Sequence, residues 1–181
     1  MSDWFETLEG LHAACWALLQ AKDGAARQPT LATVSPAGWP EARTVVLRNA
    51  DGAAGTCEIH TERDSGKARS IANNPRAALH VWEPGRALQL RLVGIAELVE
   101  GSDRQAAWAA VPVESRNNYG AAPPTGTPIG SSLDYRKLAR AEDFAVLCIT
   151  LTEIDVLHLG AQHRRARFMR QADWAGQWLS P

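Results

Sequence analysis

The chain has 181 residues, with 19 basic and 20 acidic side chains and a formal net charge of −1. This balance argues against a general nucleic-acid binder and against a polybasic membrane-binding surface, because both need an excess of basic residues. A hydrophobic content of 45% is typical of a globular protein, and we expect a single domain over residues 1–181. Arginine outnumbers lysine by 16 to three, which reflects either genomic composition or sites where a planar guanidinium binds phosphate or carboxylate.

The sequence favours a cytoplasmic protein. No apolar run reaches the roughly 18 residues needed to cross a bilayer, and the acidic start of the chain is unlike a secretory signal. The cysteines, Cys15, Cys57 and Cys148, are odd in number and far apart. This arrangement favours reduced core thiols over a disulfide framework or a zinc site.

The chain begins with a predicted amphipathic helix over residues 3–21. Apolar residues recur there at spacings of three and four, and Ser2 or Asp3 can cap the first turn. Further helices are predicted at Ser65–Asn73, Asp103–Ala110 and Asp134–Arg140.

From residue 29 the apolar period changes to two, which predicts strands separated by turn signals rich in Gly, Pro and Asn. Because helices and strands do not alternate in a βαβ rhythm, we predict a mainly β, antiparallel barrel with appended helices. The predicted strands are Thr30–Ser35, Arg43–Arg48, Cys57–Thr61, Ala77–Trp82, Ala87–Leu98, Phe144–Thr152, Asp155–Leu159 and Arg165–Arg170.

Two regions are candidates for a site or an interface. In the strand Ala87–Leu98 the leucines face one side, whereas Gln89 and Arg91 form a polar row on the other. Residues 112–132 are rich in Pro, Gly, Ser and Asn and are too long for a plain connector, so we expect them to be functional or interfacial.

An anion site is predicted between Thr61 and the helix that begins near Ser65. The Gly66-Lys67 pair is reminiscent of a nucleotide-binding P-loop, but the first glycine and the hydroxyl residue after the lysine are missing. A strand end, hydroxyl groups, a lysine and the free N–H groups of a helix start nevertheless favour a bound anion.

Arg43 and Arg48 lie at the two ends of one predicted strand, which we expect to pair with the strand ending at Thr61. They face opposite sides, but long side chains can still approach the same ligand. The alternative is that both form salt bridges at the rim.

His163, Arg165 and Arg167 share one face of another predicted strand. Three such groups repel one another unless an anion or an acidic residue on a facing strand lies opposite them. A solvated edge strand is the alternative interpretation.

From about residue 30 onward, a set of motifs follows in order: Arg43–Arg48, His60-Thr61, Ser65–Lys67, Asn73–Pro75, Gln89 with Gly94, and Arg167-Phe168. Their order and spacing resemble the pyridoxamine 5′-phosphate oxidase family of FMN-binding split barrels. The N-terminal helix and the Ser115–Tyr119 region are more similar to a divergent bacterial subgroup. The resemblance implies a homodimer with two FMN molecules in clefts at its interface.

The resemblance also implies roles for individual residues. The FMN phosphate would be held by Arg43, Ser65 and Lys67, and the flavin would be contacted by Thr44, Val45, Val46, His60, Thr61, Gln89 and Arg167, with Thr125 supplied by the other subunit. The substrate would be bound by Arg48, Ser115, His163 and Arg165.

The chain departs from the family pattern mainly at the substrate positions. Ala107 and Val111 stand where the family has a Tyr and an Arg, although Arg116 and Tyr119 lie close by and could substitute for them. Leu157 replaces a Trp beside the flavin. Gly66 removes one cation from the phosphate site, and the family's Arg-x-His is inverted to His163-Arg164-Arg165. The prediction is therefore an FMN-dependent oxidoreductase whose substrate the sequence does not name. The alternatives are a flavin or NAD(P)H-dependent reductase and a non-catalytic FMN-binding protein.

Overall fold

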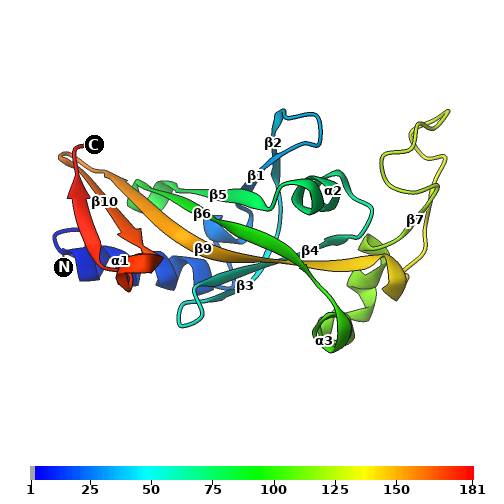
Figure 1. Cartoon of the computed structure of the whole chain (residues 1–181), viewed down its shortest axis with the longest axis horizontal. Coiled ribbons are helices and arrows are strands. Elements are labelled where there is room, and N and C mark those ends of the chain that lie inside the picture. The colour runs from blue at the N-terminus through cyan, green and yellow to red at the C-terminus, as the bar shows by residue number, and fades with distance from the viewer. Residues whose placement is uncertain (1–2) are drawn as a thin grey trace.

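The computed structural model describes residues 3–181, which form three α-helices and a mainly antiparallel sheet (Figure 1). The helices are α1 (Leu8–Gln20), α2 (Gly66–Asn73) and α3 (Gly101–Ala110). The strands are β1 (Thr30–Val34), β2 (Pro40–Thr44), β3 (Leu47–Asp51), β4 (Thr56–Glu62), β5 (Arg76–Glu83), β6 (Leu88–Val99), β7 (Ala121–Ala122), β8 (Arg136–Lys137), β9 (Phe144–Leu159), β10 (His163–Met169) and β11 (Gly176–Leu179). None of the helices within residues 3–181 is long and apolar enough to cross a membrane.

Strand β9, with 16 residues, joins the two parts of the main sheet. Its residues 144–150 pair with β4 and its residues 153–159 pair with β10, while β6 follows its other edge over residues 146–158. The sheet therefore branches along β9: one path runs β11-β10-β9-β6-β5-β1-β2, and β4 leads off the same strand to β3. This architecture agrees with the antiparallel, mainly β fold predicted from the sequence.

Gly94 allows β6 and β9 to remain paired through a β-bulge. The register shifts between Val93 and Gly94, where Thr152 of β9 is the extra residue. A Cβ atom at Gly94 would lie 2.4 Å from the carbonyl oxygen of Thr150 and 3.0 Å from the Cα of Leu151. Because these are backbone atoms, a larger residue would force the two strands apart.

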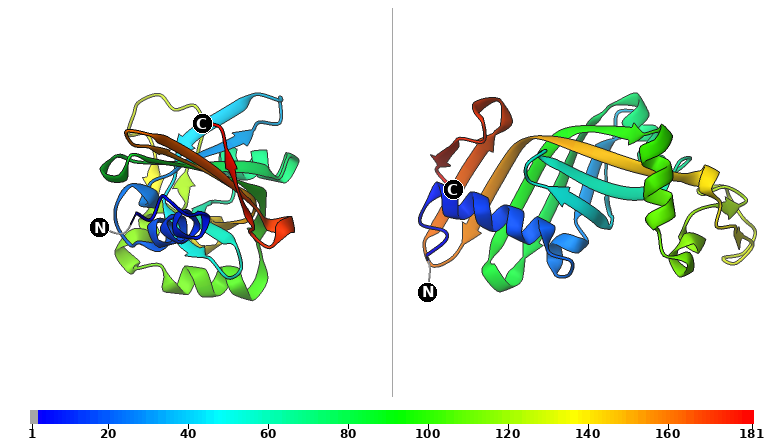
Figure 2. Two further views of the ribbon diagram at one scale, coloured as in Figure 1. Left: turned by 90° about the vertical axis from the view of Figure 1, so that its left-hand side faces the viewer. Right: turned by 90° about the horizontal axis from the view of Figure 1, so that it is seen from below.

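The core is formed by the inward faces of the strands and is closed at one end by α1. Leu88, Leu90 and Leu92 of β6 are each 0% exposed, which confirms the predicted division of this strand into two faces. Helix α1 contacts β3, β10 and β11 and lies at the opposite end of the molecule from the segment 119–137 (Figure 2).

The predicted first helix, residues 3–21, is too long at its N-terminal end, because α1 begins at Leu8. Thr7 caps the helix, its side chain accepting a hydrogen bond of 3.0 Å from a backbone N–H of the first turn. Asp3 does not cap it, and Ser2 lies outside the described residues. Before the cap, Trp4 and Phe5 pack against His158 of β9 without forming a helix. The spacing of apolar residues alone does not separate such a packed segment from a helical turn.

The predicted strand Arg43–Arg48 is two strands. Strand β2 ends at Thr44 and pairs with β1, whereas β3 begins at Leu47 and pairs with β4. The expectation that Arg43 lies on a strand paired with the one ending at Thr61 is therefore wrong. The chain changes partner between Thr44 and Leu47, and the intervening Val45 and Val46 line the space beside β4.

Three other predicted elements also differ. Asp134–Arg140 is not a helix, because β8 pairs with β7 and this tertiary pairing overrides the local helix propensity. Phe144–Thr152 and Asp155–Leu159 are one continuous strand. Strand β11, which pairs with β10, was not predicted.

Phe168→Ala is expected to destabilise the fold by about 3–5 kcal/mol, because it removes an aromatic ring from the core. Phe168 is 1% exposed, and its ring packs against His12 of α1 with centroids 4.9 Å apart. The matched control is Leu133→Ala, since Leu133 is 77% exposed and its loss should change the unfolding free energy by less than about 0.5 kcal/mol. Urea unfolding of both variants measures the difference, and equal stabilities would contradict this packing.

Candidate functional site

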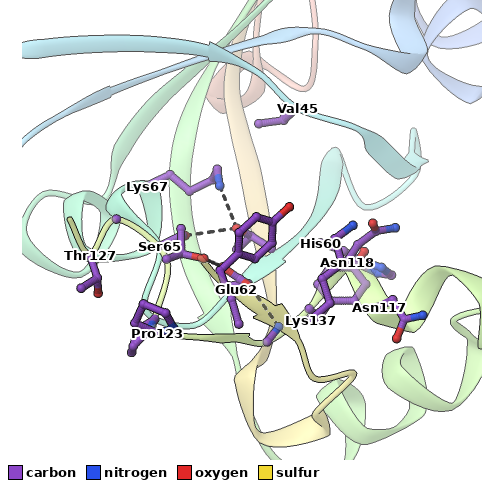
Figure 3. Close-up of a pocket in the computed structure, with 18 of the residues that line it drawn as sticks. Val45, His60, Glu62, Ser65, Lys67, Asn117, Asn118, Pro123, Thr127 and Lys137 are labelled. Carbon is purple, nitrogen blue, oxygen red and sulfur yellow. Dashed lines mark hydrogen bonds between the residues drawn. The ribbon is translucent and has the colours of Figure 1, made fainter. Parts of the chain in front are cut away.

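A pocket of about 610 Å³ lies beside the end of β4 and the start of α2 (Figure 3). One wall is the chain between β2 and β3, and the facing wall is the segment 117–137. Nine of the residues predicted for cofactor or substrate line it: Thr44, Val45, Val46, Arg48, His60, Thr61, Ser65, Lys67 and Thr125.

One end of the pocket is formed by the turn from β4 to α2. Ser65 caps α2, accepting a hydrogen bond from the backbone N–H of Ala68 at 3.4 Å. Its hydroxyl lies 3.1 Å from that of Thr61, and Lys67 donates to the Thr61 hydroxyl at 2.9 Å (Figure 3). Thr61 and Ser65 are 5% and 3% exposed. We call Thr61, Ser65 and Lys67 the helix-start cluster.

The ammonium of Lys67 is electrostatically unsatisfied. Burial lowers the pKa of Lys67, nearby Arg43 lowers it further, and Glu62 opposes the shift. Within residues 3–181 no carboxylate oxygen lies within 4.0 Å of this ammonium. A bound anion would remove the cost of holding these two cations together.

Arg43 stands beside the helix-start cluster rather than in the pocket wall. Its guanidinium donates to Thr33 at 2.7 Å and to Glu41 at 2.8 Å. Glu41 also accepts a hydrogen bond from Ser70 of α2, so this ion pair ties β2 to the helix. The structure thus gives Arg43 the salt bridge that the sequence left open as an alternative.

Glu62 fastens the segment 119–137, here called the strap, across the pocket. One of its carboxylate oxygens accepts the N–H of Gly120 at 2.9 Å, and the other accepts the hydroxyl of Thr125. Thr125 of this chain lines the pocket, and its predicted contact with the flavin of the other subunit stays a prediction. Sequence reasoning missed Glu62 as a site residue, because its partners are 58 and 63 positions away.

Tyr119, which the sequence offers as a replacement at the altered substrate positions, also lines the pocket. Its ring is 4% exposed and packs edge-on against Phe144, with ring centroids 4.9 Å apart. Arg48 donates to the Tyr119 hydroxyl at 3.4 Å, inside the pocket. His60 packs on the same aromatic cluster and pairs with Glu58 at 2.8 Å.

The remaining predicted residues lie outside this pocket. Gln89 of β6 and Arg165 of β10 both flank Leu157 of β9, and they form a second cluster on the outer face of the sheet. Here Asp155, only 3% exposed, accepts hydrogen bonds from Arg165 at 2.8 and 3.2 Å and from Arg91 at 3.0 Å. An acidic residue on the facing strand therefore pairs with one member of the predicted basic row, Arg165.

Three more predicted residues are placed by the local structure. Arg167 lies directly opposite Asp155 on this outer face, and His163 is exposed where β10 begins. Ser115 is half-buried in the short helix Val113–Asn118 and does not line the pocket.

Comparison with known proteins now identifies the class of fold. The family model for pyridoxamine 5′-phosphate oxidase matches residues 19–158, so the chain belongs to that family. The pyridoxine/pyridoxamine 5′-phosphate oxidase of Alkalilimnicola ehrlichii is 40% identical over 88 residues, which are 48% of this chain and 43% of that protein. The match thus spans less than half the length of this relative.

Solved structures confirm the split-barrel fold. A pyridoxamine 5′-phosphate oxidase-related, FMN binding protein of Nostoc punctiforme superposes with a TM-score of 0.77 at 24% identity, covering 93% of this chain and 96% of that one. PhzG from Burkholderia lata, in complex with tetrahydrophenazine-1-carboxylic acid, gives 0.69 at 18% identity, covering 86% and 82%. At these identities the likeness establishes the fold alone.

Proposed function

We propose that this protein is an FMN-dependent oxidoreductase whose helix-start cluster binds the FMN phosphate. The observation that carries the proposal is the ammonium of Lys67, which faces the pocket with no carboxylate partner among the described residues. The donors fit a phosphate: this ammonium, the hydroxyls of Thr61 and Ser65, and the start of a helix. When bound, FMN supplies a ring that accepts a hydride.

The chain between β2 and β3 would orient the flavin ring. Thr44, Val45 and Val46 line the pocket where the backbone leaves one strand partner for another. Val45 is fixed by its backbone N–H, which donates to the carbonyl of Pro29 at 3.0 Å. His60, held by Glu58, lines the same pocket from β4.

We further propose that the protein acts as a homodimer. The family resemblance implies that three residues of the outer sheet face contact flavin or substrate: Gln89, Arg165 and Arg167. In this chain all three lie away from the pocket. The same face exposes apolar side chains of β5 and β6, Trp82 (43%), Val93 (37%) and Ile95 (45%). A second copy would cover this apolar surface and bring the outer cluster to the pocket of its partner.

The structure favours a substrate other than the vitamin B6 phosphate. The positions where the family has a substrate-binding Tyr and Arg are Ala107 and Val111, and both pack with Tyr119 and Phe144 in a small hydrophobic cluster. These positions therefore serve packing and offer no polar group. A reductase on the same fold, or a non-catalytic FMN-binding protein, remains the alternative function. The free cysteines of the described chain, Cys15, Cys57 and Cys148, suit the cytoplasm proposed for it.

Lys67→Ala is expected to raise the dissociation constant for FMN by about tenfold or more, since a charge-assisted hydrogen bond contributes roughly 1.5–3 kcal/mol. Lys22→Ala is the matched control, because Lys22 is exposed and does not line the pocket. Titration of apoprotein by quenching of FMN fluorescence measures both variants. Unchanged FMN affinity in Lys67→Ala would refute the phosphate assignment.

Anaerobic mixing with candidate donors separates the possible activities. Because the substrate positions are altered, we expect pyridoxamine 5′-phosphate to bleach the bound flavin slowly. Fast bleaching by that compound would instead indicate a true pyridoxamine 5′-phosphate oxidase. Bleaching by NADH or NADPH would indicate a reductase, and no bleaching by any donor would favour a binding protein.

The dimer proposal predicts that Ile95→Glu is monomeric and binds FMN weakly, because it places a charge within the apolar outer face. Leu133→Glu is the control at an exposed apolar residue of the strap. Light scattering after size exclusion gives the mass of each variant. A wild-type protein that is monomeric with FMN bound would contradict the proposed assembly.

A further inference from the structure

Strand β9 ends beside a buried histidine that belongs neither to the pocket nor to the outer cluster. His158 is 8% exposed, and its Nδ1 atom is buried with no hydrogen-bond partner among the described residues. On β6 the residue opposite it is the apolar Leu88. A neutral imidazole tolerates this place, because one of its nitrogens carries no proton. A protonated imidazole donates from both nitrogens, so protonation would put a buried N–H where it finds no acceptor.

Residues 3–6, which we call the N-terminal segment, cover this ring where β9 turns into β10 (Figure 1). Phe5 stacks on His158 with ring centroids 4.4 Å apart and 15° between the ring planes, and Trp4 meets the same ring edge-on at 5.5 Å. The carbonyl oxygen of Trp4 in turn lies against α1, where a Cβ atom at Gly10 would come within 2.3 Å of it. The segment can therefore dock because Gly10 has no side chain.

The charges around His158 also oppose its protonation. The guanidinium carbon of Arg164 lies 4.8 Å from the centre of the Phe5 ring on which His158 stacks, so protonation would bring a second cation to that ring. The carboxylate that acts on His158 is Glu6, which already pairs with Arg164. Burial lowers the pKa of His158 below its ordinary value, and Arg164 lowers it further. Glu6 opposes this shift, whereas His163 of β10 adds to it.

We propose that His158 is a pH-sensitive switch: the neutral ring holds the N-terminal segment on the β9–β10 hairpin, and the protonated ring releases it. The inference is independent of the proposed function, because none of the residues involved lines the pocket. Release would expose Trp4 and Phe5 and uncover the end of the core against which they pack.

The direction of the switch follows from the linkage between protonation and docking. The docked ring binds a proton more weakly than the released ring does. Docking is therefore strongest above the ordinary histidine pKa of about 6.5 and weakens as the pH falls through that value.

Fluorine NMR measures the docking directly, because the chain has three phenylalanines, Phe5, Phe144 and Phe168. The full chain is labelled with 4-fluorophenylalanine and titrated from about pH 8 to about pH 5, which spans the ordinary titration of histidine. We expect the Phe5 resonance to move at least about half of the way from its docked to its released position. Phe144 and Phe168 are buried and should keep the resonance positions of the folded protein.

Gly10→Ala defines the released position. The added methyl group would clash with the backbone carbonyl of Trp4, so Phe5 should resonate at the released position even at about pH 8. Helix α1 itself is not weakened, because Ala is a better helix former than Gly.

His158→Leu removes the titrating group and keeps an apolar side chain beneath Phe5, so Phe5 should hold its docked position throughout the titration. His80→Gln is the matched control, because His80 is exposed on β5, and this variant should titrate as the wild type does. The Cε1 proton of His158, which the His158→Leu spectrum identifies by its absence, should titrate with the same midpoint as Phe5. A wild-type Phe5 resonance that stays docked, that moves equally in His158→Leu, or that has a different midpoint from the His158 proton would overturn the switch.

Discussion

The pairing of β9 with three different strands is the constraint on which the rest of the molecule depends. Its first half lies between β4 and β6, and its second half lies between β10 and β6. Gly94 makes the bulge between β6 and β9 possible, because their backbones approach too closely there for a side chain. The branch sets the end of β4, with Thr61, apart from the outer cluster around Asp155, so the two groups of predicted residues occupy different faces.

The excess of positive over negative side chains is concentrated at the pocket. The chain is close to neutral overall, yet the pocket contains three cations and one carboxylate. Outside it, two basic groups of the outer face are paired, since Asp155 binds both Arg91 and Arg165. Unpaired cations in a concave surface indicate an anionic ligand more strongly than the total number of arginines does.

The parts of the site that could be predicted from the sequence are those built by local structure. The helix-start cluster lies within seven consecutive residues, so a strand end, a capping serine and a lysine were sufficient to identify it. The alternation of Leu88, Gln89 and Leu90 likewise determined the two faces of β6. Both predictions rest on periodicity and capping, which act over a few residues.

The parts that could not be predicted depend on long-range pairing. Nothing in the run Arg43–Arg48 shows that its two halves pair with different strands. The strap is held by a two-residue ladder and by Glu62, whose partners are about 60 positions away. The local sequence does not show these contacts, so the helical propensity of Asp134–Arg140 led to a wrong prediction of a helix there. The position of Lys137 at the pocket follows from that ladder and could not be predicted from the local sequence.

The visible spectrum of the protein as purified tests the central claim most directly, because the account requires the pocket to hold a flavin. We predict the two-band absorption of an oxidised flavin, or its retention on the protein when a colourless apoprotein is mixed with FMN and free FMN is removed by gel filtration. A folded protein that is colourless and takes up no FMN would contradict the account.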